Sequence, residues 1–351
     1  MARQKKKEAR LPVLMPGVTL IQPNRVTQTS FKGFTLMMHR IFTAMMLHLQ
    51  DAIQHSMSNP DVTQLELFSE QSNDIFLRVP YSMILKDKTH YNDVRKALRA
   101  LSTLGAEIPY TDATGKKKLR ITGLLRADVP EKPDYSSDIE ISIDKKMAKL
   151  LIEIDKNEEQ SPINFTKYSY EVAQAATTTH TPPLYKLLSS WKLKGGLTIT
   201  WKELREILGI PEDQYQRFPD FKKRVLEPVQ DDLIKIGDCW FNCNVDGFKT
   251  KRKGETWLNF KIITPERKQE TDKKTEIIRG TLYNFGMTPA QMKSLDIILN
   301  DDTISRESIL HKISEIEDFM YKNNQDKSKE PIKSKQAYML SSLKKSFNAT
   351  D

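Results

Sequence analysis

The chain has 351 residues, of which 38% are hydrophobic and 29% charged. This length favours two or three domains, and no stretch approaches the roughly 18 apolar residues of a membrane-spanning helix. The two cysteines, Cys239 and Cys243, exclude a disulfide scaffold or a four-cysteine zinc site and fit a reducing cytosol.

The net charge of +9 is unevenly distributed along the chain. Residues 1–31 and residues 165–268 each carry +5, whereas residues 32–164 carry −1 and residues 269–351 are neutral. The basic excess therefore lies in an N-terminal arm and in one internal segment. Such localised positive charge indicates a polyanionic partner at those two places.

Residues 1–23 carry five basic side chains and one acidic one, and they predict a disordered basic arm. The apolar stretch that follows residue 10 resembles the core of a signal peptide. Pro12 and Pro16 interrupt it, however, and no small-residue cleavage site follows, so we do not expect a signal peptide.

Residues 24–164 predict a first domain of mixed helix and strand. Apolar residues at three- and four-residue steps predict a helix over residues 34–53. A strand at 75–79, a helix at 91–104, strands at 106–110 and 118–125, and a strand at 138–144 follow. Helices followed by a β-hairpin are the order of a winged helix.

Residues 165–268 predict the same order a second time. The expected helices are 184–193, 201–208 and 219–236, and the expected strands are 197–199, 239–245 and 255–263. Thr200 and Glu203 have the spacing of a capping box before the second of these helices. A basic loop with glycine at both ends, residues 247–254, joins the last two strands.

The long helix 219–236 places its apolar residues on one face. Lys223, Arg224, Glu227, Gln230 and Asp231 lie on the opposite face, where Arg and Lys are suited to guanine and Gln to adenine in a major groove. A solvated face with a Lys223–Glu227 ion pair is equally open from the helix alone. The basic loop favours DNA binding, because a wing would lay its cations along phosphates. Pro228 lies inside this helix and predicts a kink in it, for which the sequence gives no functional reason.

Three segments of this second domain resemble the iteron-binding replication initiators of theta-replicating plasmids. They are Leu184–Leu188, Trp201–Ile210 and Phe218–Pro228, and Asn24–Thr27 is similar to the start of that family's fold. The resemblance spans about residues 20–265 and implies an α+β protein with two tandem winged helices. Asp231–Ile234 departs from the family pattern, which puts the C-terminal half of the long helix in doubt as a DNA contact.

The resemblance also implies a function. The second winged helix would read repeats at a plasmid origin, and the first would join two copies and add DNA contacts. Monomers would open the origin, and dimers would repress the initiator's own gene. The implied partners are double-stranded origin DNA, a second copy of the chain, a host initiator protein and the replicative helicase, in the bacterial cytoplasm without a membrane. No cofactor, metal or catalytic residue is implied.

Three groups of DNA-binding candidates follow. The reading helix supplies Lys222, Lys223, Arg224, Glu227 and Gln230. The wing and the flank of the helix supply Arg217, Lys249, Lys251, Arg252 and Lys253. Auxiliary contacts in the first domain are assigned to Arg95, Lys96, Arg99, Lys116, Lys117 and Lys118.

Residues 269–351 predict a helical C-terminal extension. Helices are expected after Thr288 and around residues 309–320, and a polar linker, residues 323–335, leads to a tail helix that resembles those of many such initiators. Docking of host replication proteins, covering of the second domain and a plain solvated extension all stay open.

Enzymatic alternatives find little support in the sequence. It has no G-x-x-x-x-G-K-[ST] phosphate loop and no His-x-His metal motif of a nickase. Cys239 and Cys243 lack a second cysteine pair, which favours core packing over zinc binding. A winged-helix transcriptional repressor and, less strongly, a nicking or priming enzyme stay as alternatives. Direct repeats beside the gene would favour an initiator, whereas a lone inverted repeat would favour a repressor.

Overall fold

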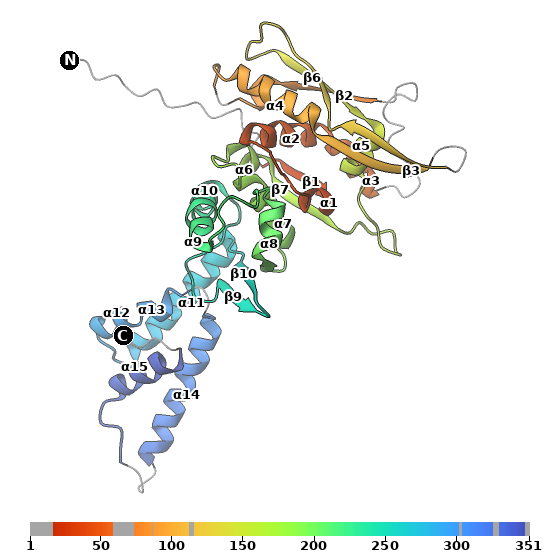
Figure 1. Ribbon diagram of the computed structural model, residues 1–351. Helices are drawn as coiled ribbons and strands as arrows, with labels where there is room; N and C mark the ends of the chain where they lie inside the picture. Colours follow the sequence, from red (N-terminus) through yellow and green to blue (C-terminus); the bar gives the residue numbers. More distant parts are fainter. Residues whose placement is uncertain are drawn as a thin grey trace, which may run out of the picture. The chain divides into compact units, whose positions relative to one another are not determined.

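The computed structural model describes residues 17–58, 74–85, 87–111, 116–301, 304–325 and 330–347 (Figure 1). The chain forms two compact units. One contains the residues up to Cys243 together with Lys251–Ile262, and the other contains Asn244–Thr250 and the residues from Ile263 onward. The first unit contains the first winged helix and most of the second.

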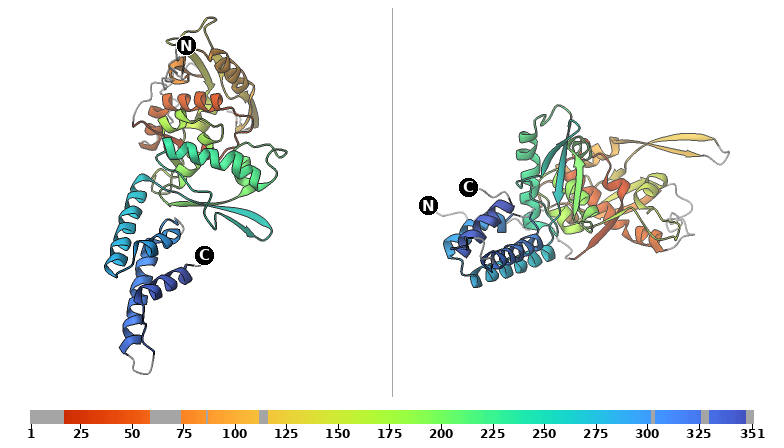
Figure 2. Two further views of the ribbon diagram at one scale, coloured as in Figure 1. Left: turned by 90° about the vertical axis from the view of Figure 1, so that its left-hand side faces the viewer. Right: turned by 90° about the horizontal axis from the view of Figure 1, so that it is seen from below.

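The first winged helix has the predicted order of helices, strand and hairpin. Its elements are β1 (Thr19–Pro23), α1 (Asn24–Thr27), α2 (Leu36–His48), α3 (Gln50–Ser58), β2 (Asp74–Pro80), a 3-10 turn (Tyr81–Met83), α4 (Tyr91–Thr103), β3 (Gly105–Thr111), β4 (Lys117–Gly123), β5 (Arg126–Asp128), β6 (Asp138–Asp144) and α5 (Lys145–Ile152). Strands β3 and β4 pair with each other and extend as a two-stranded arm (Figure 2).

A three-stranded antiparallel sheet, in the order β2-β6-β5, lies in this winged helix. Ile75, Leu77 and Val79 of β2 are buried and alternate with exposed residues, which is the two-residue period of a half-buried strand. In β6, Ile141 and Ile143 face Leu77 and Ile75 across the ladder. These cross-strand pairs fix the register, because a slip of one residue would turn every isoleucine toward solvent.

The single helix predicted over residues 34–53 is wrong, because the chain forms two helices, α2 and α3, that meet at Leu49. Gln50 supplies the reason. Its side-chain oxygen accepts a hydrogen bond from the Ile21 N–H at 2.7 Å, and its amide donates to the Ile21 carbonyl at 3.0 Å. This pair of bonds attaches the start of α3 to strand β1.

The prediction of a disordered arm over residues 1–23 is wrong for its last part. Residues 1–16 lie outside the described residues, but β1 pairs antiparallel with β7 (Phe165–Ser169), from Thr19 opposite Ser169 to Pro23 opposite Phe165. Leu20 and Gln22 of β1 are fully buried. The expected domain boundary at residue 164/165 therefore separates two strands that belong to one sheet.

The helices α6 (Tyr170–Ala175) and α7 (Thr181–Trp191) follow β7. The elements of the second winged helix after them are β8 (Gly196–Thr200), α8 (Trp201–Ile207), α9 (Phe218–Phe221), the π-helical turn η3 (Lys222–Leu226), α10 (Glu227–Ile236), β9 (Lys249–Arg252) and β10 (Glu255–Lys261). The strands pair in the order β8-β10-β9. The Thr200 hydroxyl caps α8 by accepting from the Glu203 N–H at 3.1 Å.

The strand predicted over residues 239–245 is wrong, because no strand lies between α10 and β9. Cys239 and Cys243 are nevertheless buried, as expected for core packing. Burial raises the pKa of Cys239 to about 12 and that of Cys243 to about 11. Both thiols are therefore protonated and unreactive at neutral pH.

The two winged helices pack tightly where the chain leaves α8. Gly209 has φ +66°, and a Cβ there would lie 2.3 Å from the backbone of Phe31. Only glycine allows this approach. The Phe31 N–H donates to the Ile207 carbonyl at 3.3 Å, and the Ser30 hydroxyl donates to the Glu206 carbonyl at 2.7 Å. The segment before α2 is thus bonded to the end of α8.

The second unit is a helical domain with its own core. Its helices are α11 (Pro265–Asn284), α12 (Pro289–Ser294), α13 (Asp296–Leu299), α14 (Arg306–Gln325) and α15 (Lys335–Ser346). Each of the five contributes to one buried cluster, which includes Ile278, Met292, Ile313 and Met339. A shared core of this kind distinguishes the region from a plain solvated extension. Helix α11 was not predicted, because few of its residues are apolar.

Candidate nucleic-acid interface

The reading helix is a continuous helical segment, residues 218–236, formed by α9, η3 and α10. Phe221, Val225, Val229 and Leu233 are at most 1% exposed and hold it against the domain. At its N-terminal end, Phe221 lies 5.9 Å from the Trp201 ring. The opposite face is left to solvent, as the sequence predicts.

The π-helical turn η3 accounts for Pro228. Proline has no N–H to donate to the carbonyl four residues back, and its ring clashes with that carbonyl in a regular α-helix. The wider turn at Lys222–Leu226 lies just before Pro228, which occupies the first turn of α10. Such π-turns occur frequently at functional sites. Here the turn carries Lys223 and Arg224.

Lys223 and Arg224 are exposed, while Lys222 and Glu227 are partly buried. Within the described part of the chain, neither Lys223 nor Arg224 has an ion-pair partner. The Lys223–Glu227 pair that would make this an ordinary solvated face is therefore absent from the described residues. Two uncompensated cations are available on the outer side of the π-turn.

The geometry contradicts the prediction for Gln230 as a base contact. Its side chain is 9% exposed, and its oxygen accepts a hydrogen bond from the Cys243 N–H at 2.7 Å. A regular α-helix would place residue 230 on the exposed face with Lys223, but the π-turn inserts an extra residue between them and rotates the rest of the helix. Gln230 instead holds the irregular segment that follows α10.

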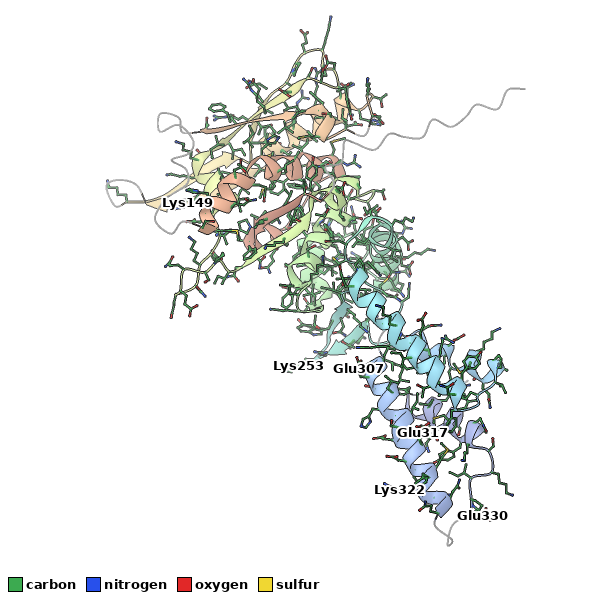
Figure 3. All side chains as sticks on the ribbon, turned by 180° about the vertical axis from the view of Figure 1, so that it is seen from behind. Lys149, Lys253, Glu307, Glu317, Lys322 and Glu330 are labelled. Carbon is green, nitrogen blue, oxygen red and sulfur yellow. The ribbon has the colours of Figure 1, made fainter. Side chains whose placement is uncertain are left out.

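The wing is a β-hairpin rather than a loop. Its tight turn is Lys253–Gly254, with φ +49° and +85°, and Figure 3 shows Lys253 at the tip. Two successive residues with positive φ are the signature of a turn that matches the twist of the strands. Lys249, Lys251, Arg252 and Lys253 are all exposed. The Arg252 guanidinium lies 5.9 Å from the Trp257 ring.

The comparisons with known proteins agree with this geometry. A family model described as "Initiator Replication protein, WH1" matches residues 19–189, and one described as "Initiator Rep protein, WH2" matches residues 200–262. Together they match about two thirds of the chain. The chain belongs to the plasmid replication initiator family. Comparison with curated proteins gives no match.

The matched ranges identify the initiator as a DNA-binding protein of two tandem winged helices, as predicted. The first model includes β7, α6 and most of α7, which agrees with the pairing of β7 with β1. The initiator's reading helix and wing both lie in the range of the second model. No described helix has the length and apolar character needed to cross a membrane.

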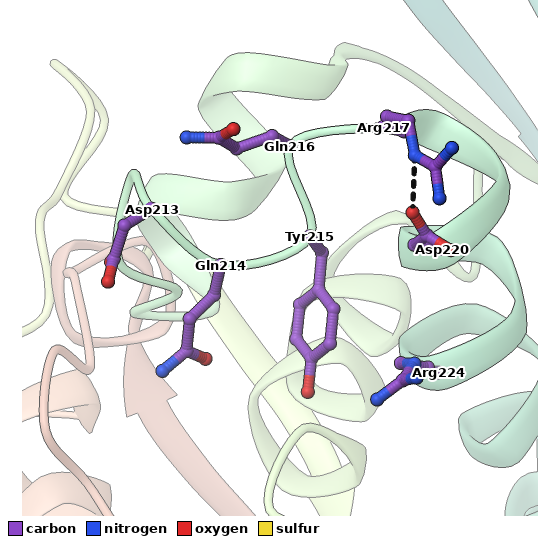
Figure 4. A pocket seen from close by; sticks show the side chains of 7 residues that line it. All are labelled: Asp213, Gln214, Tyr215, Gln216, Arg217, Asp220 and Arg224. Atoms are coloured by element: carbon purple, nitrogen blue, oxygen red, sulfur yellow. Dashed lines mark hydrogen bonds and ion pairs between the residues drawn. The ribbon is translucent and has the colours of Figure 1, made fainter.

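The flank of the initiator's reading helix is more ordered than the sequence indicates. Arg217 is exposed, but its guanidinium is paired with the Asp220 carboxylate at 2.8 Å. Both residues line a shallow pocket of about 640 Å³ (Figure 4). The pocket is otherwise lined by Arg224 and by residues 213–216 of the preceding loop. The sequence analysis did not consider this loop, although its run of polar residues before the reading helix was a signal.

The auxiliary candidates in the first winged helix have different environments. Arg95 is partly buried and donates to the carbonyls of Pro130 and Glu131, so its guanidinium holds a loop and is not available to DNA, contrary to the prediction. Lys96 and Arg99 of α4 are exposed, with Lys96 3.9 Å from the Asp93 carboxylate. Lys116 is exposed, and the side chains of Lys117 and Lys118 lie outside the described ones.

Metal chemistry has no candidate centre in the described part of the initiator. Among those residues no three His, Cys, Asp or Glu side chains are grouped closely enough to hold an ion. The candidate site is therefore a surface of exposed cations and polar groups on the second winged helix.

Proposed function

We propose that this initiator binds direct repeats at its plasmid origin through the second winged helix, helps to open the duplex there and recruits host replication proteins. The observation that carries the proposal is the exposed, unpaired position of Lys223 and Arg224 on the π-turn of the reading helix. Arginine and lysine at such a position pair with guanine O6 and N7 in a major groove.

The hairpin wing supports the same function. Lys251, Arg252 and Lys253 lie on an ordered hairpin rather than on a loop, so less conformational entropy is lost when they bind. Phosphate contacts by such cations position a protein on the duplex without reading its sequence. The reading helix therefore recognises the bases, and the wing binds the phosphate backbone.

We also propose that dimers form through the first winged helix and repress the initiator's own gene. Among the described strands, β2 has a neighbour, β6, on one side alone. Phe76 of β2 is 68% exposed, which is unusual for a phenylalanine on a sheet. An open strand edge with an exposed aromatic residue is a template for pairing with a second copy.

The helical C-terminal domain is the proposed docking region for a host initiator protein or the replicative helicase. It exposes several large apolar side chains outside its buried cluster. They are Ile277, Tyr283, Ile297, Phe319 and Tyr321. Exposed apolar groups of this kind mark protein-binding surfaces when they are contiguous.

An electrophoretic-shift titration tests the DNA-reading role. The probes are duplexes tiled from the DNA that flanks the gene and a random duplex of equal length. Lys223→Ala and Arg224→Ala are each expected to weaken binding to the repeat by about 1–3 kcal/mol and to affect the random duplex much less. Lys149→Ala, which removes one charge from α5, is the control. Equal losses on both duplexes would refute base reading.

A further inference from the structure

The loop between α8 and α9, residues 211–217, has a strained backbone next to the reading helix. Tyr215 has φ +48°, in the left-handed region that residues other than glycine seldom adopt. Such a conformation is costly for a residue with a side chain and persists only where the surroundings enforce it. Asp213, Gln214 and Gln216 of this loop are exposed.

Arg205 of α8 enforces the conformation. Its guanidinium donates to the Tyr215 carbonyl at 2.6 Å, to the Gln214 carbonyl at 2.6 Å and to the Pro211 carbonyl at 2.8 Å. The same group lies 5.6 Å from the Trp201 ring. Charge-assisted bonds from one planar fork hold the loop rigid before any ligand arrives.

The clamped loop presents its side chains in two directions. Figure 4 shows the side chains of Gln214 and Tyr215 extending to the side of the loop where Arg224 lies, while that of Gln216 extends in another direction, although all three residues line the pocket. Gln214 and Tyr215 therefore share a surface with one of the two base-reading candidates. Gln216, a residue of the same type in the same loop, also lines the pocket, but its side chain extends from the other side of the loop.

The charge of this surface distinguishes between bases and phosphates as its ligand. The pocket contains two cations, Arg217 and Arg224, and two carboxylates, Asp213 and Asp220, so it has no net charge. Phosphate contacts derive their strength from an excess of positive charge. A neutral surface with an amide is suited to base edges instead, where glutamine recognises adenine through its N6 and N7 atoms.

We propose that Gln214 and Tyr215 form a second base-reading element of the initiator, in which Gln214 recognises an adenine next to the base pairs reached by Arg224. Arg205 is the positioning residue, because it fixes the loop without facing the pocket opening. The inference rests on the proposed DNA-reading function. It extends the interface from one helix to the loop that precedes it.

Selection from a randomised duplex library by the purified full-length chain tests the proposal, because it needs no knowledge of the repeat. The wild type, Gln214→Ala, Tyr215→Phe, Gln216→Ala and Arg224→Ala proteins each select a consensus. Gln214→Ala is expected to lose an adenine preference of about tenfold at one or two adjacent positions and to keep the rest of the consensus. Gln216→Ala is expected to select the wild-type consensus.

Arg205→Lys tests the positioning role, since lysine keeps the charge and lacks the fork. It is expected to weaken the base preference at the same consensus positions as Gln214→Ala. A merely structural role of Arg205 would instead lower the affinity for every sequence alike. An unchanged consensus for Gln214→Ala, with or without weaker binding to all duplexes, would overturn the inference and leave the reading helix in place. If the wild type selected no consensus, the proposed function itself would fail, and this inference with it.

Discussion

The Asp232 carboxylate accepts a hydrogen bond from the Thr181 hydroxyl at 2.7 Å, which fastens the C-terminal half of the reading helix to the first turn of α7. The same carboxylate accepts from the N–H and the hydroxyl of Thr177, at 2.8 and 2.9 Å. Asp232 is 6% exposed, whereas Asp231 is exposed. One member of the acidic pair that departs from the family pattern is thus a structural residue.

Substitution of Asp232 by asparagine should destabilise the second winged helix. Asparagine would replace one carboxylate oxygen, which accepts hydrogen bonds from Thr177 and Thr181, by an N–H₂ group that cannot accept them. A buried donor left without an acceptor costs about 1–3 kcal/mol. We expect the free energy of unfolding to fall by about 2 kcal/mol in urea titrations. Asp231→Asn is the matched control and should change it by less than about 0.5 kcal/mol. Equal effects of the two would contradict the role of Asp232.

Removal of wing cations should alter the salt dependence of DNA binding rather than its specificity. Lys251→Ala and Lys253→Ala each remove an exposed positive charge from the hairpin. Each is expected to weaken binding to repeat and random duplexes alike and to lower the slope of log K against log salt by about 1. Fluorescence-anisotropy titrations at four salt concentrations measure both quantities. A loss confined to the repeat would instead make the wing a base reader.

Lys186 should make the stability of the protein depend on pH. Its side chain is 1% exposed, lies 3.3 Å from the Thr43 hydroxyl and has the ring of Tyr168 4.7 Å away. Burial lowers its pKa to about 7. Because the unfolded chain keeps the ordinary higher pKa of about 10.5, it binds more protons above pH 7, and stability rises with pH in that range.

Lys186→Met measures this contribution. The unfolding free energy of the variant minus that of the wild type is expected to fall by about 1 kcal/mol for each pH unit from 7.5 to 8.5, because only the wild type gains stability from this group as the pH rises. Comparing the two proteins at each pH cancels the titration of Cys239 and Cys243, whose raised pKa values act in the opposite direction. A constant difference over this range would show that Lys186 stays charged in the folded protein.

The exposed aromatic residue on β2 should matter for dimerisation. Phe76→Glu places a charge at the open strand edge, where a second copy would place its own, and like charges disfavour pairing. We expect the dimer dissociation constant in sedimentation equilibrium to rise at least about tenfold, since about 1.4 kcal/mol suffices for that change. Leu193→Glu, at a residue 97% exposed in the second winged helix, is the control. A dimer of unchanged affinity would place the interface elsewhere.

Much of the fold was predictable because its elements carry local signals. The residues of β6 alternate strictly, and its predicted bounds are those of the structure. The reading helix was predicted within one residue, from the spacing of Phe221, Val225, Val229 and Leu233. Such periodic segments bury one face, and burial is what their spacing encodes.

The features that were missed depend on contacts distant in the sequence. The pairing of β1 with β7 spans more than 140 residues, and Gln50 ends α2 because of a bond to Ile21. Within the candidate site, Lys223 and Arg224 were placed correctly as exposed. Arg95 and Gln230 were wrongly predicted to be available to DNA. The Arg95 guanidinium is hydrogen-bonded to a carbonyl, and the Gln230 side-chain oxygen to an N–H, of another segment, and nothing in the local sequence shows these bonds.

The pairing of β1 with β7 also has a consequence for synthesis. The first strand leaves the ribosome early, but its partner is translated about 150 residues later, which takes on the order of ten seconds. During that time the buried side chains of Leu20 and Gln22 have no partner strand, so a nascent initiator cannot complete its first domain. Chaperone demand should therefore peak before β7 emerges and fall once it does.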